Sequence, residues 1–305
     1  MRFMFIAIGA PWALALGGCG ANEEVGETSA QASLTKPECK TKAAGQMVWV
    51  EGGTMTLGSK PKYPEEGPPR EVTVEGFWIS ATEVTNAQFA EFVEATGYLT
   101  EAERDPPPIE GAPLEMLQPG SAVFRVPTPE NPNWWAWVPG AEWRAPSGPG
   151  SSIRDREDDP VVQVTYQDAL AYAEWAGMSL PDEDQWEFAA RAGEDAPPVP
   201  KSANTYQGVF PARDLGEDGF TSRAPVGCFE ANAFGLYDMI GNVWEWTTTA
   251  RSGAATNIIK GGSFLCAANY CARYRPSARQ FQERDLGTDH IGFRVVDVKR
   301  PGPET

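Results

Sequence analysis

The chain has 305 residues, 41% of them hydrophobic, and a formal net charge of −17 at neutral pH. An acidic surface repels phosphate backbones, so this charge argues against nucleic acid as a partner. The single histidine, His290, leaves too few imidazoles for histidine-based zinc hydrolysis or for serine–histidine catalysis. Chemistry in this chain must therefore depend on cysteines, carboxylates, aromatic side chains or backbone groups.

The first twenty residues, MRFMFIAIGAPWALALGGCG, have the pattern of an export signal. Arg2 precedes an apolar run to Leu16 that is too short to span a bilayer comfortably. The following LGGC resembles a bacterial lipobox, which predicts a signal peptide over 1–18 and lipidation of Cys19. The alternative is an ordinary signal peptide that contains a cysteine. A lipidated chain would be exported and anchored to a membrane, at the outer membrane or the periplasmic face.

Small and polar residues fill 19–45, which predicts a lipidated, flexible tether ahead of a folded domain over 46–300. Apolar residues alternate with other residues in MVWVEGGTMTLGS (47–59), and this predicts a strand and a turn. The same alternation in REVTVEGFWIS (70–80) predicts a second strand.

Three stretches have the apolar spacing of helices, namely 85–97, 165–177 and 181–193. The first two begin with a capping box, in which a threonine is followed three residues later by a glutamine or an aspartate. The third has acidic residues in its first turn, where they interact favourably with the helix dipole.

Residues 98–164 are rich in proline, glycine and tryptophan, and they predict a long irregular connection. Four of the 11 tryptophans lie within NWWAWVPGAEWRAPSGPG (133–150). They either pack beneath the loop or line a cleft for a peptide or another ligand. Because no strong helix is predicted after residue 195, the fold class is α+β, a single irregular, loop-rich domain.

Cys266 and Cys271 lie five positions apart in KGGSFLCAANYCARYR (260–275). In an exported protein the spacing alone favours a structural disulfide, yet two thiolates are also soft ligands that select Cu(I). The two side chains can converge only if the AANY between them turns, because positions i and i+5 of a strand face opposite sides. Cys39 and Cys228 could form a disulfide with each other. The four cysteines other than Cys19 allow three pairings, and the sequence does not choose among them.

Six motifs follow one another in the order of a known family: GGTMTLGS, EVTNAQFAEFV, PVVQVTYQDALAYAEWAGMSLPDEDQWEFAARAG, NAFGLYDMIGNVWEWT, KGGSF and HIGFRVV. Over about residues 45–298 the chain resembles the formylglycine-generating enzyme, or sulfatase-modifying factor, superfamily. The resemblance implies an irregular fold of C-type-lectin-like topology. Many relatives lack the cysteine pair, whereas the enzymes carry it after GGS, as in GGSFLCAANYCARYR here.

This resemblance implies a copper-dependent oxidoreductase. Its substrate would be a sulfatase polypeptide, in which the cysteine of a Cys-x-Pro-x-Arg motif is oxidised to Cα-formylglycine by molecular oxygen and Cu(I). The family's catalytic residues correspond here to the copper-binding pair Cys266 and Cys271, to Ser263 and Tyr270, which would handle oxygen or protons, and to Trp244, a wall of the oxygen site.

The resemblance also implies two structural calcium sites, for which hard oxygen ligands in loops are suitable. The alternative is that the acidic residues among them are solvated turn residues. The first site would use Asn204, Thr205, Asp218 and Phe220, and the second would use Asp238, Gly241, Val243 and Glu245.

Two hypotheses of different classes remain. The first is the enzyme, which would have to meet its substrate outside the cytoplasm. The second is a non-catalytic lipoprotein interaction module of the same fold, with Cys266–Cys271 as a structural disulfide. A further oxidase acting on a small thiol is disfavoured, because its iron-dependent relatives need histidine clusters. His290 precedes GFR and either touches substrate or water or is an ordinary loop histidine.

Overall fold

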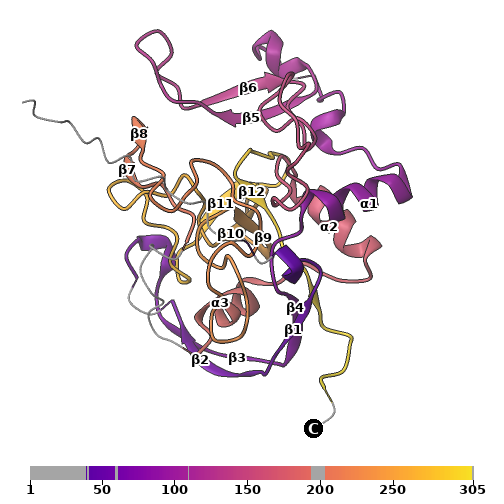
Figure 1. Cartoon of the computed structure of the whole chain (residues 1–305), viewed down its shortest axis with the longest axis vertical. Helices are drawn as coiled ribbons and strands as arrows, with labels where there is room; N and C mark the ends of the chain where they lie inside the picture. Colours follow the sequence, from indigo (N-terminus) through magenta and orange to yellow (C-terminus); the bar gives the residue numbers. More distant parts are fainter. Residues whose placement is uncertain (1–38, 40, 59–60, 109, 194–202, 304–305) are drawn as a thin grey trace, which may run out of the picture. The chain divides into compact units, whose positions relative to one another are not determined.

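A four-stranded sheet lies at the centre of the computed structural model, with β9 and β10 in its middle (Figure 1). β9 pairs antiparallel with β10 and parallel with β12. The strand order is β11 (Gln280–Glu283), β10 (Thr256–Lys260), β9 (Trp244–Ala250) and β12 (Ile291–Gly292). The structure describes residues 39, 41–58, 61–108, 110–193 and 203–303.

The other strands form one three-stranded sheet and three hairpins. In the three-stranded sheet, β1 (Met47–Val50) and β13 (Val296–Asp297) both pair antiparallel with β4 (Phe77–Ser80). The hairpins are β2 (Gly53–Leu57) with β3 (Arg70–Val74), β5 (Gly120–Phe124) with β6 (Trp135–Pro139), and β7 (Gly208–Val209) with β8 (Arg213–Asp214).

All three predicted helices are confirmed, as α1 (Asn86–Thr96), α2 (Tyr166–Trp175) and α3 (Glu183–Arg191). Each begins with a complete capping box, so the local sequence explains where it starts. Short 3-10 helices lie in the connections, as η1 (Thr41–Ala43), η2 (Pro64–Glu66), η3 (Glu101–Glu103) and η4 (Leu114–Leu117).

Strand β9 contributes to two layers, because its side chains alternate between the two faces of the sheet. Trp244 and Trp246 are buried in a core that includes Phe89 of α1 and Tyr172 of α2. Glu245 faces the other way and accepts a hydrogen bond from Trp186 of α3 at 2.7 Å. Helix α3 thus lies between the central sheet and the β2–β3 hairpin (Figure 1).

The stretch 98–164 is more regular than its composition predicts. Strands β5 and β6 form an antiparallel hairpin in which Gly120 pairs with Pro139 and Phe124 with Trp135. Sequence reasoning missed this hairpin because a ten-residue connection, rich in proline and asparagine, separates two short apolar runs. Strand pairing of this kind depends on residues far apart in sequence, whereas the helix starts depend on capping residues only three positions apart.

Part of the predicted tether belongs to the fold. Thr41–Ala43 form η1, and the side chain of Ala43 is buried. Cys39 forms a disulfide with Cys228, so these two cysteines do pair. The predicted signal peptide and Cys19 lie outside the described residues.

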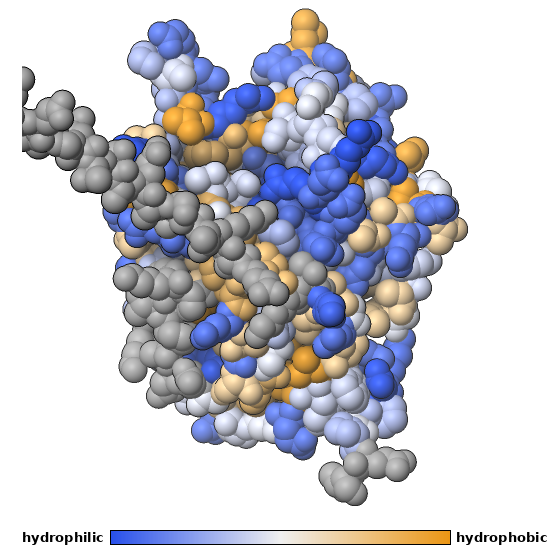
Figure 2. Space-filling model, in the orientation of Figure 1, coloured by the Kyte–Doolittle hydropathy of each residue, from blue (hydrophilic) through white to orange (hydrophobic). Residues whose placement is uncertain are grey.

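The described part of the chain holds no helix that is long and apolar enough to cross a membrane. On the face shown in Figure 2, hydrophilic residues predominate and the hydrophobic residues form separate groups. This surface agrees with the strongly negative net charge of the chain.

Candidate active site

The segment between the two cysteines turns back on itself. The backbone N–H groups of Tyr270 and Cys271 both donate to the carbonyl of Ala267, at 3.2 and 2.9 Å. The two sulfurs therefore converge, with Cys266 Sγ and Cys271 Sγ 3.9 Å apart, and neither cysteine is in a disulfide. A disulfide bond is about 2.05 Å long, so the two sulfurs are not bonded to each other. They are nevertheless close enough for one small ion to contact both.

The GGS motif explains how Cys266 is held. Gly262 has a φ of 76°, and a Cβ there would lie 2.7 Å from the Tyr274 backbone, so only glycine fits this turn. Ser263 is fully buried, and its backbone N–H donates to Cys266 Sγ at 3.4 Å. The Ser263 hydroxyl accepts a hydrogen bond from the Leu265 N–H at 3.2 Å. Local backbone geometry thus fixes the first sulfur.

A cavity of about 370 Å³ opens at the two cysteines. Three segments that are far apart in sequence supply an aromatic cluster beside it. The Tyr270 ring stacks on Phe210 at 4.9 Å, and Trp134 contacts both rings, at 5.0 and 5.2 Å. The aromatic side chains that line the cavity are Phe124, Trp134, Trp135, Phe210, Trp244 and Tyr270.

Arg273 is the cation of this site. Its Nη1 lies 3.7 Å from Cys271 Sγ, while its Nε and Nη2 donate to Glu65 at 3.0 and 2.6 Å. Its guanidinium also lies over the ring of Tyr63, 4.0 Å from the centroid. Arg273 therefore approaches the sulfur with one edge of a guanidinium whose other edge is bound by a carboxylate.

The two sulfurs differ in their acidity. The shared hydrogen bond with Cys271, together with burial, raises the pKa of the Cys266 thiol. The same hydrogen bond lowers the pKa of Cys271, and the hydrogen bond from Arg273 lowers it further against the effect of burial. Cys271 is thus the cysteine that more readily becomes a thiolate. The thiolate is the form of cysteine that binds metals and attacks electrophiles.

His290 lines the same cavity. Its Nδ1 lies 2.6 Å from the Thr288 hydroxyl, and its ring lies 4.8 Å from that of Trp135. Burial lowers the pKa of His290 to about 3, so the imidazole is neutral at ordinary pH. His290 therefore lines the cavity with one of its two ring nitrogens already hydrogen-bonded to Thr288.

The five residues predicted to be catalytic all line this one cavity: Ser263, Cys266, Tyr270, Cys271 and Trp244. Sequence reasoning did not select Phe124, Phe210 or Arg273. The ARYR motif holds Arg273, and its position two residues after Cys271 was the available signal. Nothing in the sequence around Phe210 indicates that it reaches this site.

The residues of the first predicted calcium set do lie together. Both carboxylate oxygens of Asp218 accept backbone N–H groups, from Thr205 at 3.0 Å and from Phe220 at 2.9 Å. Burial raises the pKa of Asp218, so its charge is not fully compensated by these bonds. An oxygen-rich loop with an undercompensated carboxylate is a donor set that fits Ca²⁺.

The second predicted set fits less simply. Both oxygens of Glu245 already bind Arg294, at 2.6 and 2.8 Å. Asp238 has one buried oxygen, Oδ1, without a hydrogen-bond partner, and so does Glu83, at Oε2. Burial raises the pKa of Asp238 to about 6. A cation here would find Asp238 available, but it would have to share Glu245 with an arginine.

The two sets are adjacent through Asn242. Its Oδ1 accepts hydrogen bonds from Asn204 and Ala224, while its Nδ2 donates to Glu83 at 3.0 Å. A Cβ at Gly241 would lie 2.1 Å from the Asn204 carbonyl, so these loops are pressed together. In the described part of the chain, however, no three His, Cys, Asp or Glu side chains gather in the manner of a metal site.

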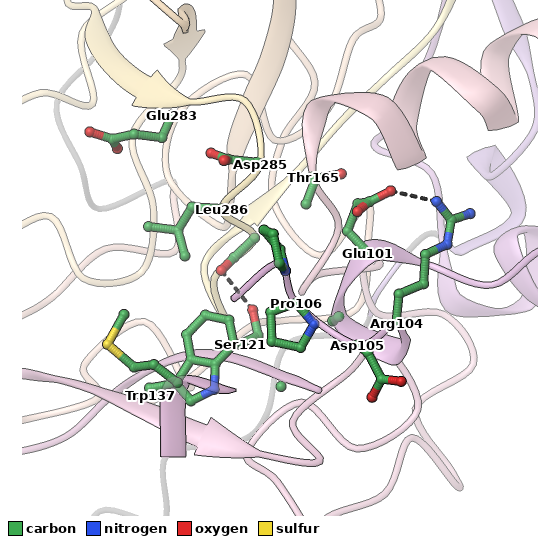
Figure 3. A pocket seen from close by; sticks show the side chains of 15 residues that line it. Glu101, Arg104, Asp105, Pro106, Ser121, Trp137, Thr165, Glu283, Asp285 and Leu286 are labelled. Atoms are coloured by element: carbon green, nitrogen blue, oxygen red, sulfur yellow. Dashed lines mark hydrogen bonds and ion pairs between the residues drawn. The ribbon is translucent and has the colours of Figure 1, made fainter. Parts of the chain in front are cut away.

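A second cavity, of about 270 Å³, lies at the other end of the β5–β6 hairpin (Figure 3). Trp137 forms part of its wall, and the Ser121 hydroxyl donates to the Gly287 carbonyl at 2.7 Å. Glu283 and Asp285 also line it, and neither carboxylate forms an ion pair within the described residues. The cavity therefore combines an indole ring with negative charge, which is a combination suited to a cationic side chain.

Comparison with known proteins agrees with this arrangement. Residues 31–299 match the family described as the sulfatase-modifying factor enzyme 1-like domain. A formylglycine-generating enzyme of Mycobacterium tuberculosis is 47% identical over 290 residues, which cover 82% of this chain and 97% of that protein.

Two further similarities bear on fold and activity. The structure of PvdO from Pseudomonas aeruginosa has a TM-score of 0.58 at 23% identity and covers 84% of this chain and 95% of that one, a likeness of fold alone. A Mus musculus relative named inactive C-alpha-formylglycine-generating enzyme 2 is 39% identical over 272 residues, covering 82% of this chain and 85% of that protein. Because a relative this similar is inactive, overall identity does not decide catalysis, and the cavity itself must.

Proposed function

The chain belongs to the family of the sulfatase-modifying factor enzyme 1-like domains, and from this we propose that it matures sulfatases by oxidising a cysteine to formylglycine. The observation that carries the proposal is the pair of free cysteines with sulfurs 3.9 Å apart in an aromatic cavity. A scaffold without catalytic function has no need of two unbonded thiols held side by side.

The finer proposal is that the substrate cysteine belongs to a Cys-x-Pro-x-Arg motif and that molecular oxygen is the oxidant. Cys266 and Cys271 fit Cu(I), because two unbonded sulfurs form a soft donor pair and, among the described residues, no carboxylate lines the cavity to favour a harder ion. When bound, Cu(I) would supply the one-electron chemistry that oxygen requires.

The electron balance of the reaction requires a further reactant, a reductant. Replacing the Cβ–S bond of the substrate by a carbonyl removes two electrons, and the sulfur leaves as hydrogen sulfide. Reducing oxygen to the level of water takes four electrons, with one oxygen atom entering the aldehyde and the other leaving as water. A thiol reductant must therefore supply two electrons and two protons in each turnover.

The chain's own residues would bind the substrate and exclude water. Aromatic rings wall the cavity and lower its dielectric, which strengthens the attraction between Arg273 and a sulfur-borne charge. His290, neutral and fixed by Thr288, offers one hydrogen-bonding nitrogen without adding charge. Ser263 holds Cys266 through its backbone N–H.

The second cavity, called the acidic cavity here because Glu283 and Asp285 line it, offers a place for the arginine of the Cys-x-Pro-x-Arg motif. Trp135 lines the cysteine cavity and Trp137 lines the acidic one, and the two lie in the same strand, β6. A substrate extended along this strand advances about 3.3 Å per residue, so a residue four positions beyond its cysteine reaches roughly 13 Å further. Glu283 and Asp285 would then receive the guanidinium.

The accompanying proposals concern calcium and location. We propose that Ca²⁺ is held at Asn204 and Asp218 as a structural ion, and that Asp238 serves a second ion. We also propose that the protein is exported and lipid-anchored through Cys19. The Cys39–Cys228 disulfide supports export, because structural disulfides persist in oxidising compartments.

The test of the enzyme is direct. Reduced protein is incubated with Cu(I), oxygen, a thiol and a peptide containing Cys-Thr-Pro-Ser-Arg, and the aldehyde is sought by mass spectrometry. Cys271→Ser should abolish turnover and leave the circular dichroism spectrum unchanged. Absence of aldehyde together with absence of Cu(I) binding by the wild type would instead favour the non-catalytic interaction module.

The acidic cavity is tested by substrate selectivity. Glu283→Gln combined with Asp285→Asn should raise KM for the arginine peptide by roughly tenfold, the order expected for losing a charge-assisted contact. For a peptide with glutamine in place of the arginine, KM should not change. Glu94→Gln, an exposed change in α1, is the matched control. An equal rise in KM for both peptides would contradict a role in binding the arginine.

A further inference from the structure

The guanidinium of Arg273 is held on three sides. Glu65 accepts two of its hydrogen bonds, the Tyr63 ring lies against its plane, and its remaining nitrogen, Nη1, points at Cys271 Sγ. The Tyr63 hydroxyl in turn accepts the backbone N–H of Ala272 at 3.2 Å. These contacts leave the arginine little freedom to swing away from the sulfur.

The segment that holds Arg273 is itself fixed. Tyr63 and Glu65 belong to the stretch around η2, between β2 and β3. The next acidic residue, Glu66, is buried and forms an ion pair with Arg275. Two neighbouring ion pairs therefore connect this stretch to the cysteine loop, and only the pair of Arg273 with Glu65 reaches the cavity.

The charge of the site explains why a cation is needed there. Two thiolates and one Cu(I) carry a net charge of −1, and a substrate thiolate would bring it to −2. Among the described residues that line the cavity, Arg273 is the only cationic side chain, because His290 is neutral. Aromatic walls do not solvate an anion, so its stability depends on this one guanidinium.

We propose that Arg273 is the positioning residue that stabilises the anionic two-sulfur copper site, and that Glu65 and Tyr63 hold it for this purpose. This inference rests on the proposed function, since Cu(I) is the ion to be bound. It adds that the affinity for Cu(I) is set by a charge that lies outside the two ligands. The carboxylate of Glu65 orients Arg273 towards the sulfur by accepting the hydrogen bonds of Nε and Nη2.

The test measures Cu(I) affinity of the reduced full-length protein by competition with a chromophoric chelator at fixed pH. Arg273→Met should weaken binding by roughly tenfold or more, because a charge about 4 Å from the sulfur is lost in a partly buried site. Arg273→Lys, which keeps the charge, should restore most of the affinity. Glu65→Gln should give an intermediate loss, because the arginine is then less firmly held.

Arg144→Met is the matched control. Arg144 also lies over an aromatic ring, Trp143, at 4.1 Å and pairs with a glutamate, Glu103, at 2.9 Å, but it does not line the cysteine cavity. Its loss should leave Cu(I) affinity unchanged. If Arg273→Met fails to fold, the comparison of Arg273→Lys and Glu65→Gln with the wild type decides the question.

The outcomes separate the inference from the proposed function. Wild-type affinity in Arg273→Met and Glu65→Gln would overturn the role of Arg273 while leaving the enzyme intact. Equal losses in Arg273→Lys and Arg273→Met would also overturn it, since geometry rather than charge would then be decisive. A wild type that binds no Cu(I) would overturn the proposed function, and this inference with it.

Discussion

His290 is buried in the wall of the cysteine cavity without a carboxylate partner that would favour its charged form. Its neighbour Asp289 is also buried, and burial raises the pKa of that carboxyl to about 6. The two shifts oppose each other in their effect on stability. Between about pH 4 and 6 the folded state takes up a proton at Asp289 that the unfolded state lacks, while it resists one at His290 that the unfolded state binds.

Removing His290 should make this opposition visible. The folded pKa of about 3 lies below the unfolded value of about 6.5, so the unfolded state binds more protons in that interval and stability falls as the pH falls. Relative to His290→Asn, the wild type should lose about 2 kcal/mol of unfolding free energy between pH 7 and pH 5. Urea unfolding of both proteins at several pH values measures this difference. A difference that does not vary with pH would show that His290 is protonated equally in both states.

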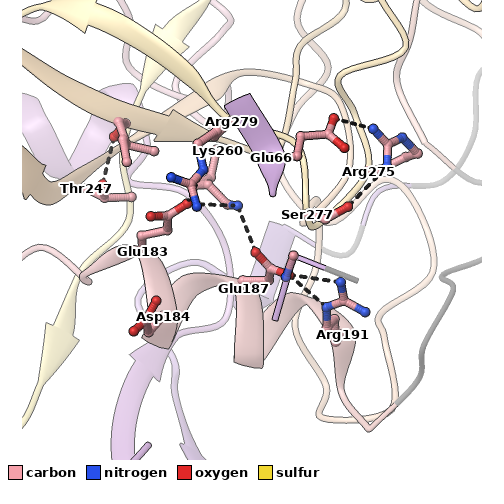
Figure 4. A network of polar contacts seen from close by, with 12 residues as sticks. Glu66, Glu183, Asp184, Glu187, Arg191, Thr247, Lys260, Arg275, Ser277 and Arg279 are labelled. Atoms are coloured by element: carbon pink, nitrogen blue, oxygen red, sulfur yellow. Dashed lines mark hydrogen bonds and ion pairs between the residues drawn. The ribbon is translucent and has the colours of Figure 1, made fainter. Parts of the chain in front are cut away.

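At the scale of elements, a buried charge network joins α3 to the central sheet (Figure 4). Lys260 of β10 is fully buried, with Nζ 3.1 Å from Glu187 and 3.7 Å from Glu183. Glu187 also accepts the backbone N–H of Gly58 at 2.9 Å. Although burial opposes ionisation, Lys260 and this N–H hold the pKa of Glu187 below its usual value.

Lys260→Met should therefore destabilise the fold strongly. It removes the cation that both buried carboxylates share, and breaking a buried ion pair costs about 3–5 kcal/mol. The midpoint of urea unfolding should fall, and Lys299→Met, at an exposed site, should leave it unchanged. Similar midpoints for both variants would mean that the arginines that also pair with these glutamates, Arg191, Arg279 and Arg70, hold the network without Lys260.

The elements also show what sequence reasoning could reach. The starts of α1 and α2 were predictable because Thr85 and Thr165 cap their helices through residues only three positions away. The β5–β6 hairpin was not, because its register depends on pairing across a connection that has no short-turn motif. The same distinction holds for the cavity. GGSFLCAANYC contains most of the reactive groups of the cavity, but Phe210 reaches the cavity, and Glu65 reaches Arg273, only through tertiary packing.

For the molecule as a whole, two cysteine pairs exist in opposite redox states. Cys39 and Cys228 are bonded across 189 positions of sequence, while Cys266 and Cys271 are free. Catalysis as proposed requires a thiol reductant, so the reductant must spare the first pair. Cys228 is buried beside Phe220 and Ala224, which shields that disulfide from exchange. Because Phe220 belongs to the first proposed calcium set, the disulfide also lies next to that loop.

The disulfide should stabilise the whole domain. Closing so long a loop restricts the unfolded chain, and native disulfides of this kind contribute about 2–5 kcal/mol. The double variant Cys39→Ser with Cys228→Ser should unfold at a lower urea concentration, with its free energy of unfolding reduced by that amount, yet bind Cu(I) as the wild type does. Strong reductant should destabilise the wild type to the level of the variant and leave the variant unaffected. If reductant lowered the stability of both proteins equally, the stabilising bond would have to lie elsewhere, and Cys266 with Cys271 would be its only other described partners. That result would assign Cys266 and Cys271 a structural role, so this stability measurement also tests the proposed assignment of the cavity.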